Sequence, residues 1–257
     1  MECGQGTEET VIGIIDSGES EQTVEHLVES VEESGGSPVV GTATAVLDTE
    51  PDAIVARGEA ALLSAGHTGT TVPIMPVVSG AGTRSVPEDA FDEALGRLVS
   101  GRFDRVERCR YAVSVGEESV GLAISDTMLV TEDPARISEY SIRSAGCDVA
   151  RFRADGLVVA TPLGSHGYAA AAGGPMLAPG TGVVAVPVAQ FATDRDSWVL
   201  GAHETVQLRV ERDEGPVELL VDDERHSVVE PASDITLTPV APLRLVVVPE
   251  SDPCWTE

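Results

Sequence analysis

The first hundred residues alternate short apolar runs with amphipathic stretches. The β-branched run "TVIGIID" (10–16) predicts a strand. In residues 21–36 apolar side chains recur at every third or fourth position, which predicts a helix with one apolar face. Further strands are predicted at 37–47 and 72–78, and a further helix at 87–101. Residues 51–66 are predicted as a strand, a turn at Arg57-Gly58 and a short helix. Strands that alternate with helices indicate a parallel sheet with crossovers, so we predict an α/β N-terminal domain, residues 1–102, with a Rossmann-like parallel sheet.

The pattern changes after residue 102. Strand-like runs now follow one another with only short turns between them, which favours antiparallel layers. A stretch of small side chains, "YAAAAGGP" (168–175), interrupts them and is predicted as a helix. The strand-like runs lie at 105–116, 120–131, 137–146, 147–161, 182–191, 204–212, 216–224 and 242–250. We therefore predict a second, mostly-β domain over 103–250 and a loose acidic tail over 251–257.

The charge balance limits the partners of the protein. The chain has 257 residues, with 43 acidic against 16 basic residues and a formal net charge of −27, and every basic residue is arginine. Such a surface repels phosphate backbones and anionic lipid, so we expect neither nucleic acid nor membrane as a partner. In molar salt the Debye length is only about 3 Å, and a dense carboxylate surface is tolerated there. The composition is typical of a cytoplasmic protein of a salt-loving archaeon.

Cysteine and histidine spacing argues against a metal or redox motif. Cys3, Cys109, Cys147 and Cys254 lie far apart without a C-x-x-C pair, and we expect isolated buried thiols. The five histidines show no ligand spacing, so no protein-held metal is predicted. The first ten residues are polar and acidic, unlike a signal peptide, and no apolar run approaches the roughly 18 residues of a membrane span. We expect a cytoplasmic protein.

The stretch 155–175, "DGLVVATPLGSHGYAAAAGGP", is the strongest candidate for a binding site. Small residues let a flat ligand approach a helix closely, and the helix start offers free N–H groups to a phosphate or ribose oxygen. The ring of Tyr168 can stack and hydrogen-bond, and Asp155 can accept hydrogen bonds at a strand end. A nucleotide fits this set, although a helix packed tightly on a sheet would also use small residues.

Two other motifs are weaker. Ser165 and His166 suggest a hydrolase, but Leu163 stands where the nucleophile motif G-x-S-x-G needs glycine, and adjacent serine and histidine side chains point apart. The turn "SGAGTRS" (79–85) lacks the Gly-Lys-Ser/Thr of a phosphate-binding loop, so a plain turn is predicted there.

The segment 153–179, "RADGLVVATPLGSHGYAAAAGGPMLAP", resembles the dinucleotide-binding motif of NAD kinases, which is close to ADG-(apolar)-STPTGSTAY-x-x-SAGGP-x-x-x-P. Flanking segments at 87–115, 216–224 and 242–250 are similar to the family's helix and strands, so the resemblance covers most of the chain. The matching positions are Asp155, Gly156, Thr161, Pro162, Gly164, Ser165, Tyr168, Gly173, Gly174, Pro175 and Pro179.

The resemblance implies an α/β domain followed by a β-rich domain. It implies transfer of a phosphoryl group from ATP or polyphosphate to the 2′-hydroxyl of NAD, giving NADP, with Mg²⁺ and in a homodimer or homotetramer. The ligands would be NAD or NADP and ATP. The dinucleotide-binding residues that it implies are Gly58, Ser125, Asp126, Arg153, Asp155, Ser165, His166, Gly167, Tyr168 and Ala171.

The sequence departs from the family at its catalytic loop. Where the family has GGDGT, this chain has "ARGEAALL" (56–63), with Gly58 at the second glycine and Glu59 in place of the aspartate that is the proposed base. Glu59 is one methylene longer and could still act as the base, so it is the catalytic candidate. Ala60 adds a Cβ where glycine would allow close approach of a phosphate.

Other family positions also differ. Ser125 and Asp126 stand for the family's Asn-Glu pair, and His166 and Gly167 replace Thr and Ala. The stretch "PVAQFATDRD" (187–196) replaces one that contains Pro-His. Two hypotheses therefore stay open. The protein is either a divergent NAD kinase with Glu59 as its base, or a non-catalytic relative that binds a nucleotide and acts as a regulatory or binding protein.

The charge leads to a first prediction, on salt. At a net charge of −27, self-repulsion opposes the compact state, and dilute buffer does not screen it. The melting temperature, followed by circular dichroism, should therefore rise steeply between about 0.1 M KCl and several molar KCl, since the screening length falls several-fold over that range. A melting temperature that stays constant over this range would contradict the prediction.

Overall fold

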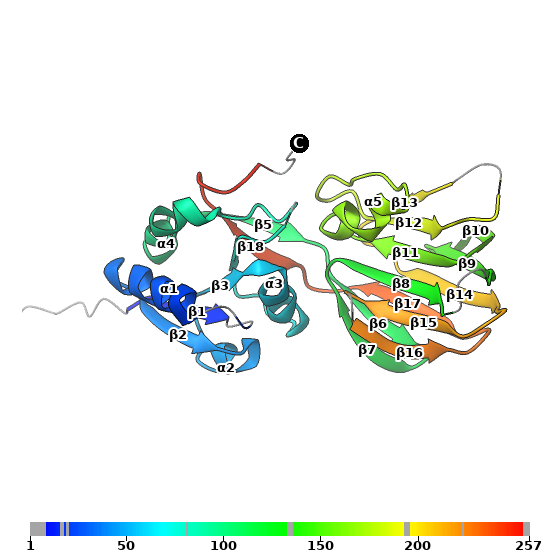
Figure 1. Ribbon diagram of the computed structural model, residues 1–257, viewed down its shortest axis with the longest axis horizontal. Helices are drawn as coiled ribbons and strands as arrows, with labels where there is room; N and C mark the ends of the chain where they lie inside the picture. Colours follow the sequence, from blue (N-terminus) through cyan, green and yellow to red (C-terminus); the bar gives the residue numbers. More distant parts are fainter. Residues whose placement is uncertain are drawn as a thin grey trace, which may run out of the picture. The chain divides into compact units, whose positions relative to one another are not determined.

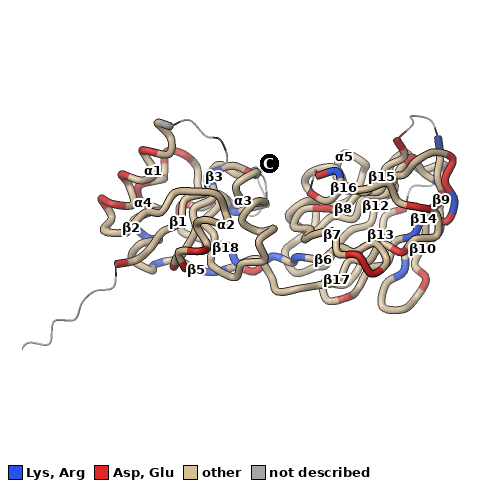
Figure 2. The backbone as a smooth tube through the Cα atoms, turned by 90° about the horizontal axis from the view of Figure 1, so that it is seen from below, with Lys and Arg blue, Asp and Glu red and all other residues tan. Residues whose placement is uncertain are grey.

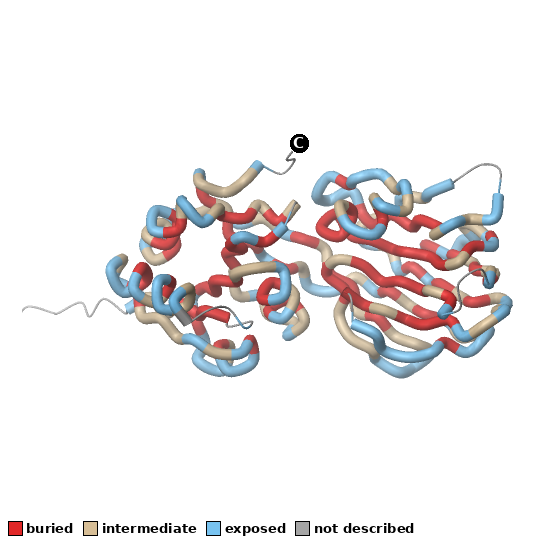
Figure 3. Tube along the Cα trace, in the orientation of Figure 1, coloured by how far each residue is buried: buried red, intermediate tan, exposed pale blue. Residues whose placement is uncertain are grey.

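The computed structural model describes residues 9–15, 18, 21–80, 82–132, 136–192, 196–222 and 224–253. The chain divides into two compact units (Figure 1). The first comprises Met1–Glu107 together with Arg244–Glu257, and the second comprises Arg108–Leu243. Each unit has its own apolar core, and the strands carry most of the buried residues (Figure 3). None of the described helices is long and apolar enough to span a membrane.

The first unit contains a six-stranded sheet with the order β2-β1-β3-β4-β18-β5. The pairs β1–β2, β1–β3, β3–β4 and β4–β18 are parallel, which confirms the predicted α/β fold with a parallel sheet. The strands are β1 (Val11–Ile15), β2 (Ser37–Gly41), β3 (Ala53–Arg57), β4 (Ile74–Val77), β5 (Asp104–Arg108) and β18 (Leu243–Val247). The helices are α1 (Glu21–Glu33), α2 (Ala43–Leu47), α3 (Gly58–His67), η1 (Glu88–Ala90) and α4 (Phe91–Val99).

The predicted strand over 37–47 is wrong in its second half, which forms α2. The Thr42 hydroxyl accepts a hydrogen bond from the Ala45 N–H (3.4 Å) and so caps the helix start. Val46 packs against Gly13 of β1, where an added Cβ would stand only 2.2 Å from its Cγ1. The β-branched residues favoured a strand, but the close approach to a glycine in β1 decides for a helix.

The strand β18 differs from the predicted division, which placed 242–250 in the second domain. It lies between β4 and β5, with Leu245 opposite Ile74, so it completes the sheet of the first unit. The apolar run would suit either core, and only its pairing partner distinguishes them. The first part of the predicted loose tail also belongs here, because the Asp252 N–H donates to the Ser85 carbonyl (2.8 Å).

The second unit contains two six-stranded sheets that enclose one core. Their orders are β10-β9-β14-β17-β6-β7, called the B sheet here, and β13-β12-β11-β8-β15-β16, called the C sheet. All described pairs within them are antiparallel, as predicted for this part of the chain. The strands are β6 (Tyr111–Val115), β7 (Glu118–Ala123), β8 (Asp126–Thr131), β9 (Ser138–Ser144), β10 (Cys147–Ala154), β11 (Gly156–Ala160), β12 (Val183–Val188), β13 (Trp198–Leu200), β14 (Val206–Arg212), β15 (Val217–Val221), β16 (Glu224–Val229) and β17 (Asp234–Pro239).

Two predicted single strands are each divided between the two sheets. The run 120–131 breaks at Ile124-Ser125 into β7 of the B sheet and β8 of the C sheet. The run 147–161 breaks at Asp155 into β10 and β11 in the same way. Residues on both sides of each break face the shared core, so the apolar alternation continues through it. The breaks place Ser125 and Asp155, two predicted site residues, where the chain crosses between sheets.

Candidate functional site

The loop after β11 is fastened to the crossing at Ile124-Ser125 by one threonine. The Thr161 N–H donates to the Ser125 carbonyl (2.8 Å), and its hydroxyl donates to the Ile124 carbonyl (2.6 Å). The same hydroxyl accepts a hydrogen bond from the Leu163 N–H (3.1 Å). Thr161 is buried, so these bonds form away from water and position the loop against the start of β8.

The next turn requires glycine at position 164. A Cβ at Gly164 would lie 2.2 Å from the Ser125 carbonyl oxygen and 2.9 Å from the Ser125 Cα. These atoms belong to the backbone and cannot rotate away. The match to the family motif at Gly164 therefore has a direct steric cause, namely the contact between two loops.

Ser165 holds the loop from inside. It is 0% exposed, its hydroxyl donates to the Pro162 carbonyl (2.9 Å), and it accepts a hydrogen bond from the Leu177 N–H (3.0 Å). Both bonds are internal, so the structure gives this side chain a role in holding the loop. The predicted contact of Ser165 with a dinucleotide stays a prediction, and the geometry does not favour it.

Asp222 braces the crossing from the opposite side and was not singled out in the sequence. Its Oδ2 accepts a hydrogen bond from the Ile124 N–H (2.8 Å), and its Oδ1 accepts from the N–H groups of Ser125 (2.7 Å) and Asp126 (2.9 Å). Its own N–H donates to the Asp126 carbonyl (3.0 Å). An aspartate after an apolar strand was the available signal, because short acids favour turns and tolerate a positive φ, here 47°.

Asp126 and Ser125 lie on this braced turn. Asp126 is buried and begins β8 opposite Ala160, whereas Ser125 is partly exposed. The structure thus brings Ser125 and Asp126 next to the Thr161–Ser165 loop. Their role as ligand-binding residues stays a prediction.

The tip of the loop combines packed and exposed residues. The 3-10 helix η2 (Gly164–His166) is followed by α5 (Tyr168–Ala171). His166 is partly buried, whereas Gly167, Tyr168 and Ala171 are exposed, with Tyr168 at 53%. The Tyr168 ring is therefore open to a stacking partner.

Tight packing explains part of the small-residue pattern. Ala169 packs with Val158, Ala160, Val184 and Val186 on the outer face of the C sheet. A Cβ at Gly174 would lie 2.5 Å from the Val186 Cγ2. The alternative explanation, a helix packed closely on a sheet, therefore holds for Ala169 and Gly174.

Asp155 and Arg153 lie at the other end of β11. Gly156 pairs with Val130, whereas Ala160 pairs with Asp126, so β11 separates Asp155 from the start of the Thr161–Ser165 loop by roughly 20 Å at the usual rise of a strand. Asp155 is partly buried, and the exposed Arg153 pairs with Glu214 (2.8 Å). The structure does not gather these two residues with that loop.

Gly58 and Glu59 belong to the first unit. Instead of a separate turn, Gly58 (φ 79°) starts α3 directly after β3, and its carbonyl accepts a hydrogen bond from the Ser79 hydroxyl (3.2 Å). No side chain caps the helix, and Glu59 lies exposed in the first turn, where a negative charge is favourable. Their roles in catalysis and binding stay predictions.

The described residues do not include a group of three or more His, Cys, Asp or Glu side chains that could hold a metal ion. Burial raises the pKa of the partly buried Cys109 thiol to about 11, which keeps it protonated at neutral pH. Cys147 is exposed, so the expected burial is wrong for that thiol. Cys3 and Cys254 lie outside the described residues.

Comparisons with known proteins point to one family. Residues 124–248 match the family model of the ATP-NAD kinase C-terminal domain. The NAD kinase of Methanosarcina acetivorans is 29% identical over 237 residues, which cover 85% of each chain. The NAD kinase of Methanospirillum hungatei is 33% identical over 132 residues, 51% of this chain, and the match spans only 49% of that relative.

Two solved structures share the fold. The NAD kinase from Archaeoglobus fulgidus, crystallised in complex with ATP, has a TM-score of 0.73 at 20% identity over 91% of this chain and 92% of its own. The yeast NADH kinase complexed with NADH has a TM-score of 0.77 at 15% identity over 97% of this chain and 86% of its own.

The contacts of Asp222 lead to a second prediction. In Asp222→Asn the side chain keeps its shape and its tolerance of positive φ, but an NH₂ group replaces one of the two oxygens that accept backbone hydrogen bonds. We expect a loss of about 1–3 kcal/mol in the free energy of unfolding, because buried N–H donors lose an acceptor. Chemical denaturation at constant molar salt measures this loss. Asp213→Asn, which makes the same change in the loop before β15, should leave the stability within about 0.5 kcal/mol of wild type. Equal stability of both variants would contradict the bracing role.

Proposed function

We propose that this chain, whose place in the NAD kinase family is supported by the family model, the relatives and the fold, phosphorylates NAD. The reaction is transfer of a phosphoryl group from ATP, or from polyphosphate, to the 2′-hydroxyl of NAD, giving NADP. The match of the ATP-NAD kinase C-terminal domain model to residues 124–248 carries the proposal. That segment contains the loop that Thr161, Gly164 and Asp222 hold in place.

The braced loop suits a nucleotide because it is rigid at its base and open at its tip. Internal hydrogen bonds fix the base, so little conformational entropy would be lost on binding. The exposed ring of Tyr168 offers a stacking surface, and Ser125 stands at the edge of the braced turn. One solved structure with this fold is a complex with ATP and another is a complex with NADH, which agrees with nucleotide ligands for this chain.

In the proposed reaction Glu59 is the general base. Its exposed carboxylate accepts the proton of the 2′-hydroxyl of NAD while that oxygen forms a bond to the γ-phosphorus of ATP. The bond between the γ-phosphorus and the bridging oxygen breaks, and ADP leaves with the electron pair. Positioning and charge stabilisation contribute most of the rate enhancement in such transfers.

Mg²⁺ would supply charge neutralisation on the transferred phosphate when it is bound. The described residues do not form a group that fits a protein-held metal site. We therefore propose that Mg²⁺ enters with the phosphates of ATP. We also propose that the protein is cytoplasmic, that it is adapted to high salt, and that it forms a homodimer or homotetramer.

The second hypothesis, a nucleotide-binding protein without catalysis, is favoured by one feature of the first unit. Residues 58–61 are the first turn of α3, and Ala61 is completely buried there. An ordinary helix start therefore stands where the family has a glycine-rich catalytic loop. Ala60 carries a Cβ atom where the family has glycine, and Ala61 lacks the hydroxyl of the family's threonine.

The two hypotheses differ in the third prediction, which concerns Glu59. If the protein is a kinase, Glu59→Gln should lower the rate of NADP formation by about 10²–10⁴-fold, the usual contribution of a general base. The assay uses NAD, ATP and Mg²⁺ in molar KCl. Glu25→Gln makes the same change at another exposed glutamate, on α1, and as the control it should leave the rate unchanged. An unchanged rate in Glu59→Gln would exclude this residue as the base. Binding of nucleotide without any NADP formation by wild type would favour the second hypothesis.

The fourth prediction concerns Tyr168 and holds for both hypotheses. Removing the ring in Tyr168→Ala should weaken nucleotide binding by about 1–3 kcal/mol, a typical value for stacking on a base. Tyr168→Phe keeps the stacking surface and should bind nearly as well. Calorimetry in high salt measures both affinities. The absence of heat and of any thermal shift with NAD, NADP and ATP for wild type would contradict the binding proposal.

A further inference from the structure

Three hydroxyl side chains are buried in the segment after β4, for which the sequence predicts a plain turn. Ser79 is 1% exposed, and Thr83 and Ser85 are each 4% exposed. Serine and threonine are mostly exposed in proteins, and a hydroxyl is buried without a large cost only when it is hydrogen-bonded. The partners of these buried hydroxyls therefore show what the turn holds in place.

Ser79 links this turn to the first residue of α3. Its hydroxyl lies 3.2 Å from the Gly58 carbonyl oxygen and 3.2 Å from the Val77 carbonyl oxygen, so its one proton is shared between two acceptors. Gly58 begins α3 with a φ of 79°, and the N-cap residue Arg57 makes no side-chain cap hydrogen bond. The hydroxyl from the neighbouring strand therefore holds the helix start, which the cap residue does not.

Ser79 is itself held by the rest of the turn. Its N–H donates to the Ser85 hydroxyl (2.8 Å), and its carbonyl accepts a hydrogen bond from the Thr83 hydroxyl (2.8 Å). The Ser85 carbonyl in turn accepts a hydrogen bond from the Asp252 N–H (2.8 Å), so the segment after β18 fixes the turn from the other side. Ser79 cannot shift without breaking several buried hydrogen bonds.

The backbone just before Ser79 is strained. Val78 has a φ of 49°, which is rare for a β-branched residue, and it is 45% exposed. The Val78 N–H donates to the Val86 carbonyl (3.0 Å), and the Val86 N–H donates to the Pro76 carbonyl (2.9 Å). Strain of this kind persists only where the surrounding structure imposes it, and it is concentrated at functional sites. Here the valine is exposed and the serine after it is buried, the reverse of their usual preference.

The sheet does not require the contact between Ser79 and Gly58. The strands β3 and β4 are neighbours that already pair in parallel (Figure 1). Along its length α3 is anchored by completely buried side chains, namely Ala61, Leu62 and Ala65. Helix ends fray even when an apolar face is well packed, and the Ser79 hydroxyl acts at the end residue. Its contribution is therefore to the position of the helix start.

The residue that depends most directly on this position is Glu59. It follows Gly58 in the chain and is exposed in the first turn of α3. A general base must stand within hydrogen-bond reach of the proton that it accepts, and a misplacement of about 1 Å can cost about 10²-fold in rate.

We propose that Ser79 is a positioning residue for Glu59. Its hydroxyl holds the Gly58 carbonyl and thereby fixes the backbone from which the base of the proposed reaction extends. This inference rests on the proposed function, because Ser79 takes part only in a reaction that Glu59 serves.

The test is a double-mutant cycle on the rate of NADP formation, measured with the full chain in molar KCl. Ser79→Ala removes the hydroxyl and keeps the backbone hydrogen bonds of the turn. We expect it to lower kcat by about tenfold and to leave the KM values for NAD and ATP within about twofold, because a displaced base slows the chemical step and not binding. In the Glu59→Gln background the same substitution should have no further effect, since the base through which Ser79 acts is gone.

The cycle separates positioning from stability. A loss of folded protein would lower the rate by the same factor in both backgrounds, and that result would overturn the proposal. Ser30→Ala is the control, because it removes another buried serine hydroxyl of the first unit, one that donates to Asp92 on α4. It should leave kcat unchanged, and circular dichroism melts show that each variant is folded at the assay temperature.

Hydrogen–deuterium exchange gives a second measurement, which does not require activity. Without the Ser79 hydroxyl the start of α3 should open more often, so the amides of residues 61–63 should exchange about two- to tenfold faster, the factor that one hydrogen bond gives to an opening equilibrium. The amides of α1 should exchange as in wild type. Unchanged exchange at the start of α3 would overturn the proposal.

The outcomes keep this inference and the proposed function apart. A wild type that forms NADP through Glu59, together with an unchanged kcat in Ser79→Ala, overturns the inference and leaves the proposed function standing. A wild type that forms no NADP overturns the proposed function and, with it, the part of Ser79 in the reaction. The exchange experiment then decides by itself whether the hydroxyl holds the start of α3.

Discussion

The second unit depends on the close contact between the Ile124–Asp126 turn and the loop that follows β11. The chain leaves one sheet and enters the other at this turn, which would leave backbone N–H groups without partners. The Asp222 carboxylate accepts three of them, and Thr161 bonds to two of the carbonyls. Gly164 fits against the Ser125 carbonyl only because it has no Cβ. The candidate site is therefore part of the structure that joins the two sheets.

This constraint explains why different parts of the motif have different meanings. Thr161, Gly164 and Ser165 match the family at positions that build the loop or hold it against the Ile124–Asp126 turn. Tyr168 and Ala171 remain exposed at the tip and are available to a ligand. A match to the family at a position that builds the loop supports the fold of the loop. Only a match at an exposed position bears directly on what the loop binds.

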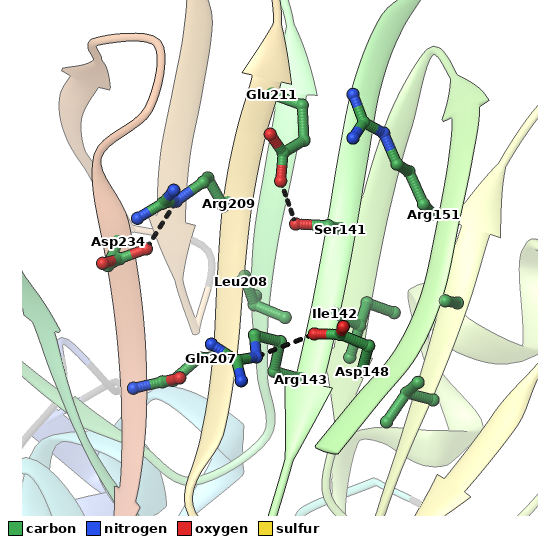
Figure 4. A pocket seen from close by; sticks show the side chains of 12 residues that line it. Ser141, Ile142, Arg143, Asp148, Arg151, Gln207, Leu208, Arg209, Glu211 and Asp234 are labelled. Carbon is green, nitrogen blue, oxygen red and sulfur yellow. Dashed lines mark hydrogen bonds and ion pairs between the residues drawn. The ribbon is translucent and has the colours of Figure 1, made fainter. Parts of the chain in front are cut away.

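The net charge affects the whole molecule, whereas the loop after β11 affects only the region where the two sheets join. The chain has far more acidic residues than arginines (Figure 2). Among the described residues, several arginines form ion pairs with acids on one face of the B sheet (Figure 4). In water such pairs add little to the stability of one chain.

The sequence by itself determined the alternating strands and helices of the first unit and the antiparallel character of the second. The periodicity of apolar residues and the spacing of turns are local properties of the sequence, and the structure contains the kinds of element that they predict. The motif in 153–179 likewise identified the loop that the structure holds in place. Tertiary structure decided the rest. It placed β18 beside β4, turned 43–47 into a helix against Gly13, and split two apolar runs between sheets that share one core. It also separated Asp155 from Thr161 by the length of β11 and brought Asp222, which follows β15, to the Ile124 N–H, 98 residues earlier in the chain. Such contacts depend on which segments meet in space, and a pattern of apolar and polar residues is the same whichever partner completes it.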